Sequence, residues 1–266
     1  MTTEIVPKNT DAVKNALTAT PDMVVSKSLK ALLGSTSIKA RFEEMLKTKA
    51  AGFMSSVLSA VAANKALQTC DPMTVIQAAA IAAALDLPIN GSLGMAHIVP
   101  YKGAAAFQLG WKGYVQLAMR SGQYRTINLF EAHEGQVKSH NPFTGQMEFD
   151  LTAPANGPVV GYGLYFSLIN GYEKYFYMTV AEVTAHAKKF SMSFGNENGQ
   201  WKKNFPAMAL KTVAKMGLSK YGILSIEMQT AVVRDQSVST SDDAPIVYPD
   251  GKDAIIEGEA VTEPAA

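Results

Sequence analysis

Two runs of alternating β-forming residues, joined by Asn170-Gly171, constrain the fold more than any other feature of the sequence. The first run is GYGLYFSLI and the second is YEKYFYMTV. An Asn-Gly pair suits a type I′ turn, because both central residues of that turn need positive φ. The sequence therefore predicts an antiparallel hairpin with its turn at Asn170-Gly171.

Helical patterns precede this hairpin. Apolar residues recur about one turn apart from Ile38 to Val61, which predicts one helix over that range. Asp71-Pro72 supplies an N-cap and a proline at the first position of an alanine-rich helix, which we expect to end at Pro88. The small alanine side chains would let a neighbouring segment approach this helix closely.

Four further elements are predicted from local signals. Turn residues at Lys102-Gly103 indicate short strands or a hairpin within 89–110, and a helix is expected from Trp111 to Arg120. The T-x-x-E sequence from Thr179 to Glu182 is a capping box that begins another helix. A final helix is predicted from about Phe205 to Tyr221.

The order of these elements is helices, then mixed strands, then helices, which predicts an α+β fold rather than alternating βαβ units. Along the chain we expect a loosely ordered segment at 1–35, a core at 36–235 and an acidic, disordered tail at 236–266. The most apolar stretch, Met73 to Ile89, is shorter than the roughly 20 residues that span a bilayer. We therefore expect a buried helix there and no membrane contact.

Composition excludes several classes of site. Cys70 is the only cysteine, so an internal disulfide and a thiolate metal cage are excluded, and a reducing cytoplasm fits best. The only Gly-Lys pair, Gly251-Lys252, is followed by Asp253 and is therefore no P-loop. The four histidines lack metal-ligand spacing. We expect no catalytic residue, no metal and no cofactor, so a binding function is favoured.

The formal net charge of +1 hides two oppositely charged parts. Of the 24 basic and 23 acidic residues, one basic and seven acidic residues follow Thr240. The tail after Thr240 therefore carries a charge of −6 and the rest of the chain a charge of +7. Plain solvation of the tail is one expectation. Competition with a polyanionic ligand for the basic part of the chain and tethering of a protein partner are the two alternatives.

The positive charge is concentrated near the end of the core. Between His186 and Tyr221 there are seven lysines and one acidic residue, Glu197, with aromatic residues among them. Lys211 and Lys215 are one helical turn apart and share a face. Such cations can follow a phosphate backbone while aromatic rings stack on bases. The pattern favours nucleic acid as a ligand, with an ordinary solvated lysine surface as the alternative.

Two runs of the sequence carry a resemblance to a known family. The run FQLGWKGYVQLAMRSGQ at 107–123 is similar to one signature of the RecT family of phage single-strand annealing proteins. The pattern W…F..M..KT…KY at 201–221 is similar to that family's second block, and AHIVPY at 96–101 and Leu67…Cys70-Asp71-Pro72 fit the family's pattern too. The resemblance covers roughly residues 40–235, and Met216-Gly217 departs from it.

The resemblance implies an ATP-independent protein, not an enzyme, that coats single-stranded DNA and anneals it to its complement in recombination. It implies a Rad52-like core, in which a mixed or antiparallel sheet with hairpins is backed by helices and DNA lies in a basic groove. The implied partners are single-stranded DNA, the annealed duplex, further copies in a ring or helical filament, a 5′→3′ exonuclease and a single-strand binding protein, the last two contacted through the tail. It also implies a phage or prophage origin and the cytoplasm of a bacterial host.

We predict that lysines and arginines contact DNA phosphates and that a tryptophan stacks on a base. Two rival functions stay open: a protein that protects single strands without annealing them, and a metal-dependent nuclease that uses Glu131, His133 and His140. The predicted DNA-binding residues are Lys102, Trp111, Lys112, Arg120, Arg125, Lys188, Lys189, Trp201, Lys202, Lys203, Lys211 and Lys215.

Overall fold

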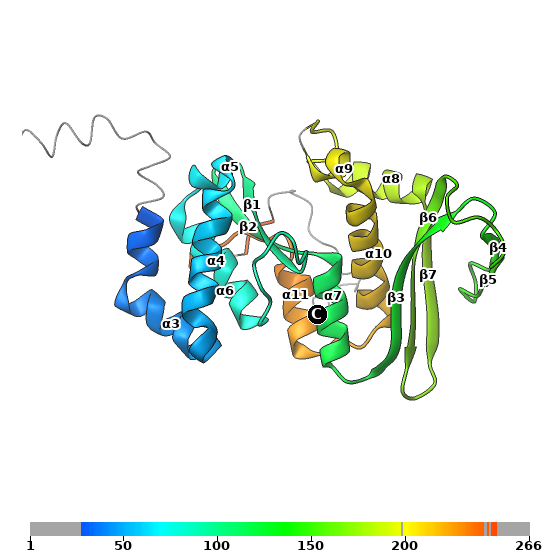
Figure 1. Ribbon diagram of the computed structural model, residues 1–266, viewed down its shortest axis with the longest axis horizontal. Helices are drawn as coiled ribbons and strands as arrows, with labels where there is room; N and C mark the ends of the chain where they lie inside the picture. Colours follow the sequence, from blue (N-terminus) through cyan, green and yellow to red (C-terminus); the bar gives the residue numbers. More distant parts are fainter. Residues whose placement is uncertain (1–27, 198, 242–243, 245, 249–266) are drawn as a thin grey trace, which may run out of the picture. The chain divides into compact units, whose positions relative to one another are not determined.

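The computed structural model describes residues 28–197, 199–241, 244 and 246–248 (Figure 1). The chain divides into two compact units. The helical unit comprises Met1–Ile89, Ile98–Ala106 and Ser239–Ala244, and the sheet unit comprises Asn90–His97, Phe107–Val238 and Pro245–Ala266. The expectations for loosely ordered residues before 28 and for a disordered tail after 248 lie outside the described residues. The division of the chain at residues 35 and 235 stays a prediction.

In the helical unit, the single helix predicted from Ile38 to Val61 is replaced by two. The helix α3 spans Thr36–Leu46 and α4 spans Ala50–Ala62, with the 3-10 helix η1 at Lys47–Lys49 between them. The prediction of one helix is wrong because Lys47 has a φ of 52°, which a right-handed helix cannot contain. Residues 28–33 are helical as well.

The alanine-rich helix α6 (Pro72–Ala84) follows the short helix α5 (Lys65–Gln68) and begins as predicted. The Asp71 carboxylate accepts a hydrogen bond from the Met73 amide at 2.9 Å, and Pro72 occupies the first turn. The helix ends before Pro88 because Asp86 already has positive φ. Most of its alanines are buried, and α3 packs against it.

The strands β1 (Ala96–Tyr101) and β2 (Ala104–Leu109) form the hairpin predicted within 89–110. Lys102 and Gly103 have φ values of 47° and 82°, and a type I′ turn needs positive φ at both of these positions. The tip of this hairpin belongs to the helical unit, and its two ends belong to the sheet unit.

The sheet unit contains a three-stranded antiparallel sheet in the order β3-β6-β7. A separate antiparallel pair is formed by β4 and β5. These strands confirm the predicted α+β class with antiparallel sheets. Their bounds are Tyr124–His133 for β3, Val137–His140 for β4, Met147–Phe149 for β5, Val159–Leu168 for β6 and Glu173–Thr179 for β7.

Five helices of the sheet unit accompany these strands. The helix α10 packs against all three strands of the larger sheet and against α7, so that it lies between them (Figure 1). Both predicted helix ranges, for α7 and α10, are confirmed, and so is the capping box at the start of α8. The bounds are Trp111–Arg120 for α7, Val180–Phe190 for α8, Gln200–Lys203 for α9, Phe205–Tyr221 for α10 and Ile226–Arg234 for α11.

The sequence patterns do not predict α9 or α11. With nine residues, α11 is too short for a periodic pattern to stand out, and its burial depends on contacts with α7. None of the described helices is long and apolar enough to cross a membrane.

The connection between β6 and β7 differs from the predicted type I′ turn. Gly171 has a φ of 89°, but Asn170 does not have positive φ. The Asn170 side-chain oxygen instead accepts a hydrogen bond from the Tyr172 amide at 3.0 Å, and the Gly171 amide donates to the Leu168 carbonyl at 3.1 Å. A turn followed by one left-handed glycine closes a hairpin with a longer loop. The antiparallel pairing itself is confirmed.

Alternation along β6 gives the larger sheet two different faces. Leu164 is fully buried and points toward α10, where a Cβ atom on Gly217 would lie 2.7 Å from its methyl carbon. Gly163 lies on the opposite face, where a Cβ atom would lie 2.2 Å from Cζ of Phe130. Glycine is therefore required on both sides of the sheet, once for the close approach of α10 and once for an aromatic ring.

Two helical glycines offer a matched test of this close packing. A Cβ atom on Gly113 of α7 would lie 2.3 Å from the Met95 carbonyl oxygen, whereas nothing lies within 4 Å of one on Gly52 of α4. We expect Gly113→Ala to lower the free energy of unfolding by about 1–3 kcal/mol. Gly52→Ala should raise it by about 0.4–1 kcal/mol, because alanine restricts the unfolded chain. Urea denaturation followed by circular dichroism measures both, and equal effects would contradict the packing described for α7.

Candidate nucleic-acid interface

The carboxylate of Asp235 is fully buried and accepts four hydrogen bonds. Its Oδ1 atom accepts from the Leu109 amide at 2.9 Å and from Nζ of Lys211 at 3.0 Å. Its Oδ2 atom accepts from Nζ of Lys215 at 3.0 Å and from the Tyr114 hydroxyl at 3.2 Å. We call these five residues the Asp235 network; it joins β2, α7 and α10 to the residue that follows α11.

The charges of this network explain how a carboxylate is kept ionised in the interior. Burial by itself raises the pKa of Asp235, but the charges of Lys211 and Lys215 and the Leu109 amide outweigh it, and the pKa falls to about 2. Burial and the neighbouring carboxylate raise the pKa of Tyr114 well above its ordinary value, so its hydroxyl stays a donor. Two cations and one anion leave a local surplus of one positive charge.

Backbone pairing fixes Asp235 in this position. The Gln236 amide donates to the Phe107 carbonyl at 2.8 Å, and the Phe107 amide donates to the Ser237 carbonyl at 3.3 Å. Gln236 has a φ of 67°, which turns the chain sharply after α11. The segment after α11 is thereby held beside β2, and the Asp235 side chain is directed toward the lysines of α10.

Two histidines lie close to the same lysines, and their pKa values are lowered by the positive charge there. The pKa of His97 is lowered by burial and by the charge of Lys211. The pKa of His186 on α8 is lowered by burial and by the charges of Lys215 and Lys189. Both imidazoles are therefore neutral at pH 7. The effect on His186 also shows that the last turn of α8 lies near Lys215 of α10.

The structure separates the predicted DNA-binding residues by their exposure to solvent. Lys211 and Trp201 are buried, and Lys215 and Trp111 are half-buried. Lys102 belongs to the helical unit and the other eleven to the sheet unit. Their contact with DNA stays a prediction. The eight exposed residues are Lys102, Lys112, Arg120, Arg125, Lys188, Lys189, Lys202 and Lys203.

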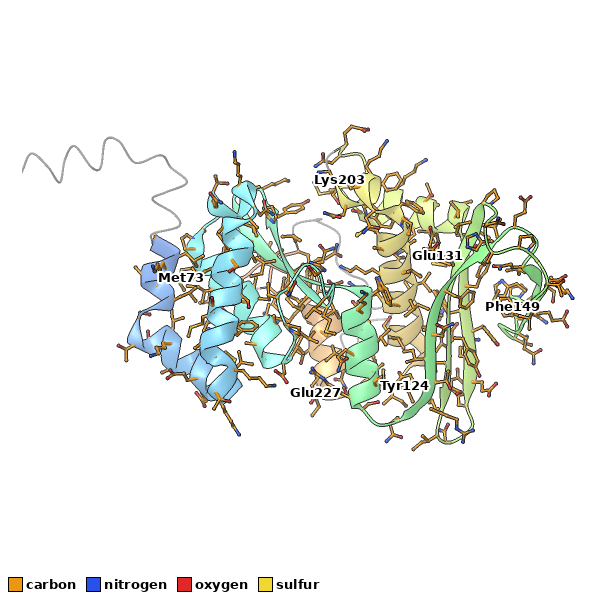
Figure 2. The ribbon with its side chains drawn as sticks, viewed as in Figure 1. Met73, Tyr124, Glu131, Phe149, Lys203 and Glu227 are labelled. Carbon is orange, nitrogen blue, oxygen red and sulfur yellow. The ribbon has the colours of Figure 1, made fainter. Side chains whose placement is uncertain are left out.

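Five of the predicted lysines form what we call the cationic face: Lys188 and Lys189 on α8, Lys202 and Lys203 on α9, and Lys215 on α10. The helix α9 directly precedes α10 and contacts it, and Figure 2 shows Lys203 on α9. Lys202 forms an exposed ion pair with Glu197 at 3.2 Å, which contributes little in water. The cationic face therefore keeps a strong surplus of positive charge.

The cations of α7 lie at opposite ends of that helix. Lys112 follows Trp111 at the first turn, and Arg120 is in the last turn, about 12 Å farther along the axis. The pKa of Glu227 is lowered by its own backbone amide, by the Ser225 hydroxyl and by the charge of Arg120. Arg120 thus lies beside the start of α11, whereas Lys112 lies at the end of α7 that contributes Tyr114 to the Asp235 network.

The two tryptophans differ in accessibility. Trp201 is 5% exposed and packs edge-on against Phe194 and Phe205, each at 5.7 Å between ring centroids. Its Nε1 atom has no hydrogen-bond partner among the described residues. Trp111 is half-buried, and Nζ of Lys112 lies 5.6 Å from the centroid of its ring. Trp111 is therefore the tryptophan with an accessible surface for a base.

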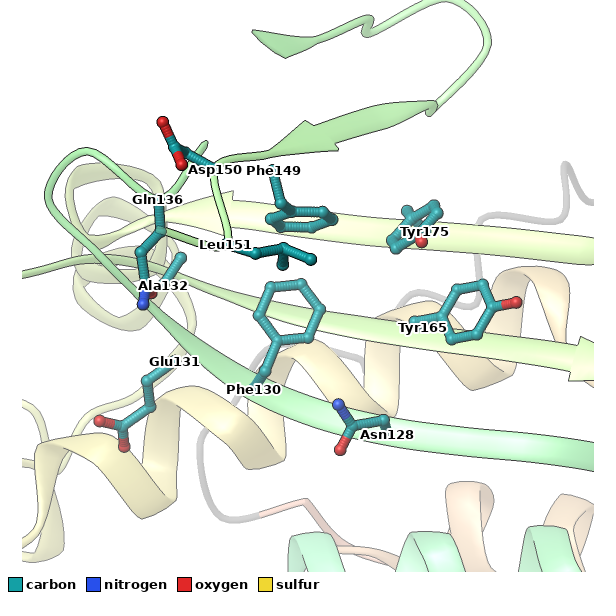
Figure 3. Close-up of a pocket in the computed structure, with 10 residues that line it drawn as sticks. All are labelled: Asn128, Phe130, Glu131, Ala132, Gln136, Phe149, Asp150, Leu151, Tyr165 and Tyr175. Atoms are coloured by element: carbon teal, nitrogen blue, oxygen red, sulfur yellow. The ribbon is translucent and has the colours of Figure 1, made fainter. Parts of the chain in front are cut away.

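Sequence reasoning missed an aromatic pocket on the face of the larger sheet opposite α10. Phe130, Phe149, Tyr165 and Tyr175 line a cavity of about 360 Å³, with Leu151 at its side (Figure 3). The Tyr165 and Tyr175 rings are 4.6 Å apart. The aromatic residues Tyr165 of β6 and Tyr175 of β7 were the available signal, but Phe149 comes from β5, and no local pattern in the sequence predicts that it lies here. The pocket can accept a flat, apolar group.

The residues of the nuclease hypothesis are used in other ways. The Nδ1 atom of His133 lies 2.6 Å from the Gly157 carbonyl oxygen, and the His140 ring packs edge-on against Tyr177 at 5.5 Å. The Glu131 carboxylate points away from the aromatic rings of the pocket (Figure 3). Among the described residues, no group of three or more His, Cys, Asp or Glu side chains could hold a metal ion. The structure therefore gives the nuclease hypothesis no support.

Comparison with known proteins decides the family. The sequence profile of the RecT family matches residues 51–249, which include both signature runs, the Asp235 network and the cationic face. The chain belongs to the RecT family. It is 51% identical over 209 residues to the uncharacterized protein YqaK of Bacillus subtilis (strain 168), an alignment that covers 78% of this chain and 72% of YqaK. It is 30% identical over 182 residues to protein RecT of Escherichia coli (strain K12), covering 64% of this chain and 65% of that protein.

Within this RecT-family chain, the Asp235 network should appear in the pH dependence of stability. The pKa of Asp235 in the folded protein, about 2, is below its ordinary value of 3.8. The ionised carboxylate therefore contributes stability that is fully present above about pH 4 and is lost as the pH falls toward 2. This pH-dependent contribution to the free energy of unfolding is roughly 2 kcal/mol. Asp235→Asn should also cost about 3–5 kcal/mol at pH 7, because it leaves two lysines without a counter-charge.

Urea unfolding of both proteins between pH 7 and pH 2 measures this effect. The difference in unfolding free energy between wild type and Asp235→Asn should shrink by roughly 2 kcal/mol as the pH falls below 4. Glu197→Gln, which removes a highly exposed carboxylate, is the control and should behave like wild type. A difference that stays constant over this pH range would show that Asp235 is not held ionised as described.

Proposed function

We propose that this RecT-family chain binds single-stranded DNA through the cationic face and anneals it to a complementary strand without ATP. One observation supports this above the others. The fold neutralises part of the positive charge of α10 internally, through Asp235, and leaves the lysines of α8 and α9 exposed beside it. The remaining positive charge therefore faces solvent, where a phosphate backbone can reach it.

Contact through phosphates suits annealing. Lysines that neutralise phosphates carry no sequence information, so any strand is bound, and the base edges stay free to pair with a second strand. Lys112 extends the proposed DNA contact along α7, and Trp111 is the base-stacking residue we propose. Lys102, Arg120 and Arg125 are exposed and are proposed as further phosphate contacts.

Three of the predicted DNA-binding residues have other roles in this proposal. Lys211 is 6% exposed, and its ammonium group is bound to Asp235. We assign it a positioning role, in which it fixes α10 against α7 and β2. Lys215 is intermediate, since Asp235 binds its ammonium group and part of its side chain reaches the surface. Trp201 is assigned to the packing of α9 against α10 by its contact with Phe205.

The remaining parts of the proposal rest on the family and on the sequence. We propose that copies of the chain assemble in a ring or filament on the strand, that the duplex is the product, and that no ATP site or metal is used. A 5′→3′ exonuclease and a single-strand binding protein are proposed as protein partners. A phage-encoded protein in the cytoplasm of a bacterial host is the proposed setting.

A strand-annealing assay tests the function directly. Complementary oligonucleotides, one carrying a fluorophore and the other a quencher, are mixed with and without the protein and without nucleotide. We expect the protein to accelerate duplex formation, because it holds both backbones neutralised. Tight binding without acceleration would favour the rival protein that only protects single strands. Shortening of labelled DNA with Mg²⁺ or Mn²⁺ would favour the nuclease.

The dependence of affinity on salt tests the cationic face. Each phosphate contact on a single strand contributes about 0.7 to the slope of log affinity against log salt. Replacing both Lys188 and Lys189 by alanine should therefore lower the slope by about 1.4 and weaken all sequences alike. Lys211→Met should reduce stability but leave the slope nearly unchanged.

Fluorescence anisotropy of a labelled oligonucleotide from 50 to 500 mM NaCl measures these slopes. Lys138→Ala is the control, because Lys138 is an exposed lysine of the sheet unit on β4, outside the three helices that carry the cationic face. A slope that falls equally in the control and in the α8 variant would show that the cationic face is not the binding surface.

A further inference from the structure

The chain that follows α11 is anchored beside the cationic face. Val238 and Val247 exchange backbone hydrogen bonds of 2.8 and 3.1 Å, and the Tyr248 hydroxyl donates to the Val233 carbonyl of α11 at 2.6 Å. Val233 is two residues from Asp235, which binds Nζ of Lys215 at 3.0 Å. Tyr248 is therefore held near Asp235, and Asp235 binds a lysine of the cationic face.

The sequence immediately beyond this anchor has the opposite charge. Residues 249–266 contain five acidic side chains and one lysine, a net charge of −4. The cationic face contains five lysines, of which Lys202 is paired with the exposed Glu197 and Lys215 with the buried Asp235. The charges of the two parts are complementary in sign.

We propose that residues 249–266 of the chain bind to the cationic face of the same chain and compete there with single-stranded DNA. This inference rests on the proposed function, since it regulates the same surface. The segment would act as an intramolecular polyanion that DNA must displace. DNA strands that are short or bind weakly would then be excluded at low salt. A long strand that contacts several protomers would displace the segment.

Chain geometry permits this contact. An extended chain advances at most about 3.3–3.6 Å per residue. Glu257 is nine residues after Tyr248 and can therefore lie up to about 30 Å from it. Val233 and Asp235 are at most about 7 Å apart along the chain, so Lys215 is well within this reach. His186, whose pKa is lowered by burial and by the charges of Lys215 and Lys189, connects the same region to α8.

The expected strength follows from tethering. A tether of this length gives an effective concentration on the order of 1 mM. If the segment alone binds the face with a Kd of about 0.1–0.5 mM, it raises the apparent Kd for DNA by about threefold to tenfold. The effect depends on exposed charges, so it should disappear as salt shortens the Debye length to about 3–5 Å.

The test uses the full chain with its tail charges removed. One variant replaces the five acidic residues by their amides, and a second variant permutes residues 249–266 with composition and charge unchanged. A third combines the neutral tail with alanine at Lys188 and Lys189. The substitutions of the neutral tail are Asp250→Asn, Asp253→Asn, Glu257→Gln, Glu259→Gln and Glu263→Gln.

Affinity for a short labelled oligonucleotide is compared at 50 mM NaCl and at 500 mM NaCl. The neutral tail should tighten binding about threefold to tenfold at low salt and have no effect at high salt. The permuted tail should bind like wild type, because only its charge matters. Removing Lys188 and Lys189 should reduce the gain obtained from the neutral tail. Unchanged affinity in the neutral-tail protein would overturn the proposal and leave the segment available for a protein partner.

A second readout does not depend on DNA binding. Zero-length carbodiimide cross-linking joins carboxylates to amines in direct contact, and we expect links between residues 250–263 and the cationic face that are lost when DNA is added. An equal mixture of ¹⁵N-labelled and unlabelled protein shows whether each link lies within one chain. Links found only between chains would overturn the intramolecular contact. If no variant binds DNA but the links form, the proposed function fails and the tail contact stands.

Discussion

The sheet unit depends on the burial of one ionised carboxylate, Asp235. Moving a carboxylate and two ammonium groups out of water is costly, and the attraction between them offsets this cost only when the remaining hydrogen bonds are also made. Here the Leu109 amide and the Tyr114 hydroxyl make them. Because the four donors come from three separate elements, the network forms only when β2, α7 and α10 are correctly placed. It therefore acts as a specificity constraint on packing.

The helix α10 shows how this constraint shapes the proposed interface. Gly217 allows the helix to approach the sheet, and Leu218 is buried. Two turns before Leu218 on the same helix, Lys211 is turned inward, although it is charged, because Asp235 binds its ammonium group there. Lys215 is bound to the same carboxylate but reaches the surface. A single helix thus carries apolar packing, an internal ion pair and the inner edge of the cationic face.

The accuracy of the sequence-based predictions follows the range of the interactions involved. The bounds of α7 and α10, the capping box at Thr179 and the turn at Lys102-Gly103 are confirmed, because neighbouring residues decide them. The burial of Lys211 depends on a carboxylate 24 residues away, and the contact between Leu109 and Asp235 spans 126 residues. No periodicity in the sequence contains such information.

The same limit applies to the aromatic residues. The interleaving of Trp201 and Phe205 with lysines looks the same in the sequence whether the rings face DNA or each other, and the structure places them in contact. Likewise, the aromatic pocket needs Phe149 from β5 to meet Tyr175 from β7. Composition and spacing therefore identify which residue types are present, whereas the direction of each side chain depends on the tertiary structure.

The placement of acidic groups gives this chain two kinds of response to salt. Asp235 binds its lysines in the interior, where dissolved ions screen poorly, so the alignment of α10 should persist as ionic strength rises. Contacts between exposed lysines and either DNA or residues 249–266 are screened together. If the segment already occupies the cationic face, DNA replaces one polyanion by another and releases fewer counterions than it would from a bare surface. The slope measured for the full chain then counts only the additional contacts that DNA makes, and neutralising the tail should steepen it.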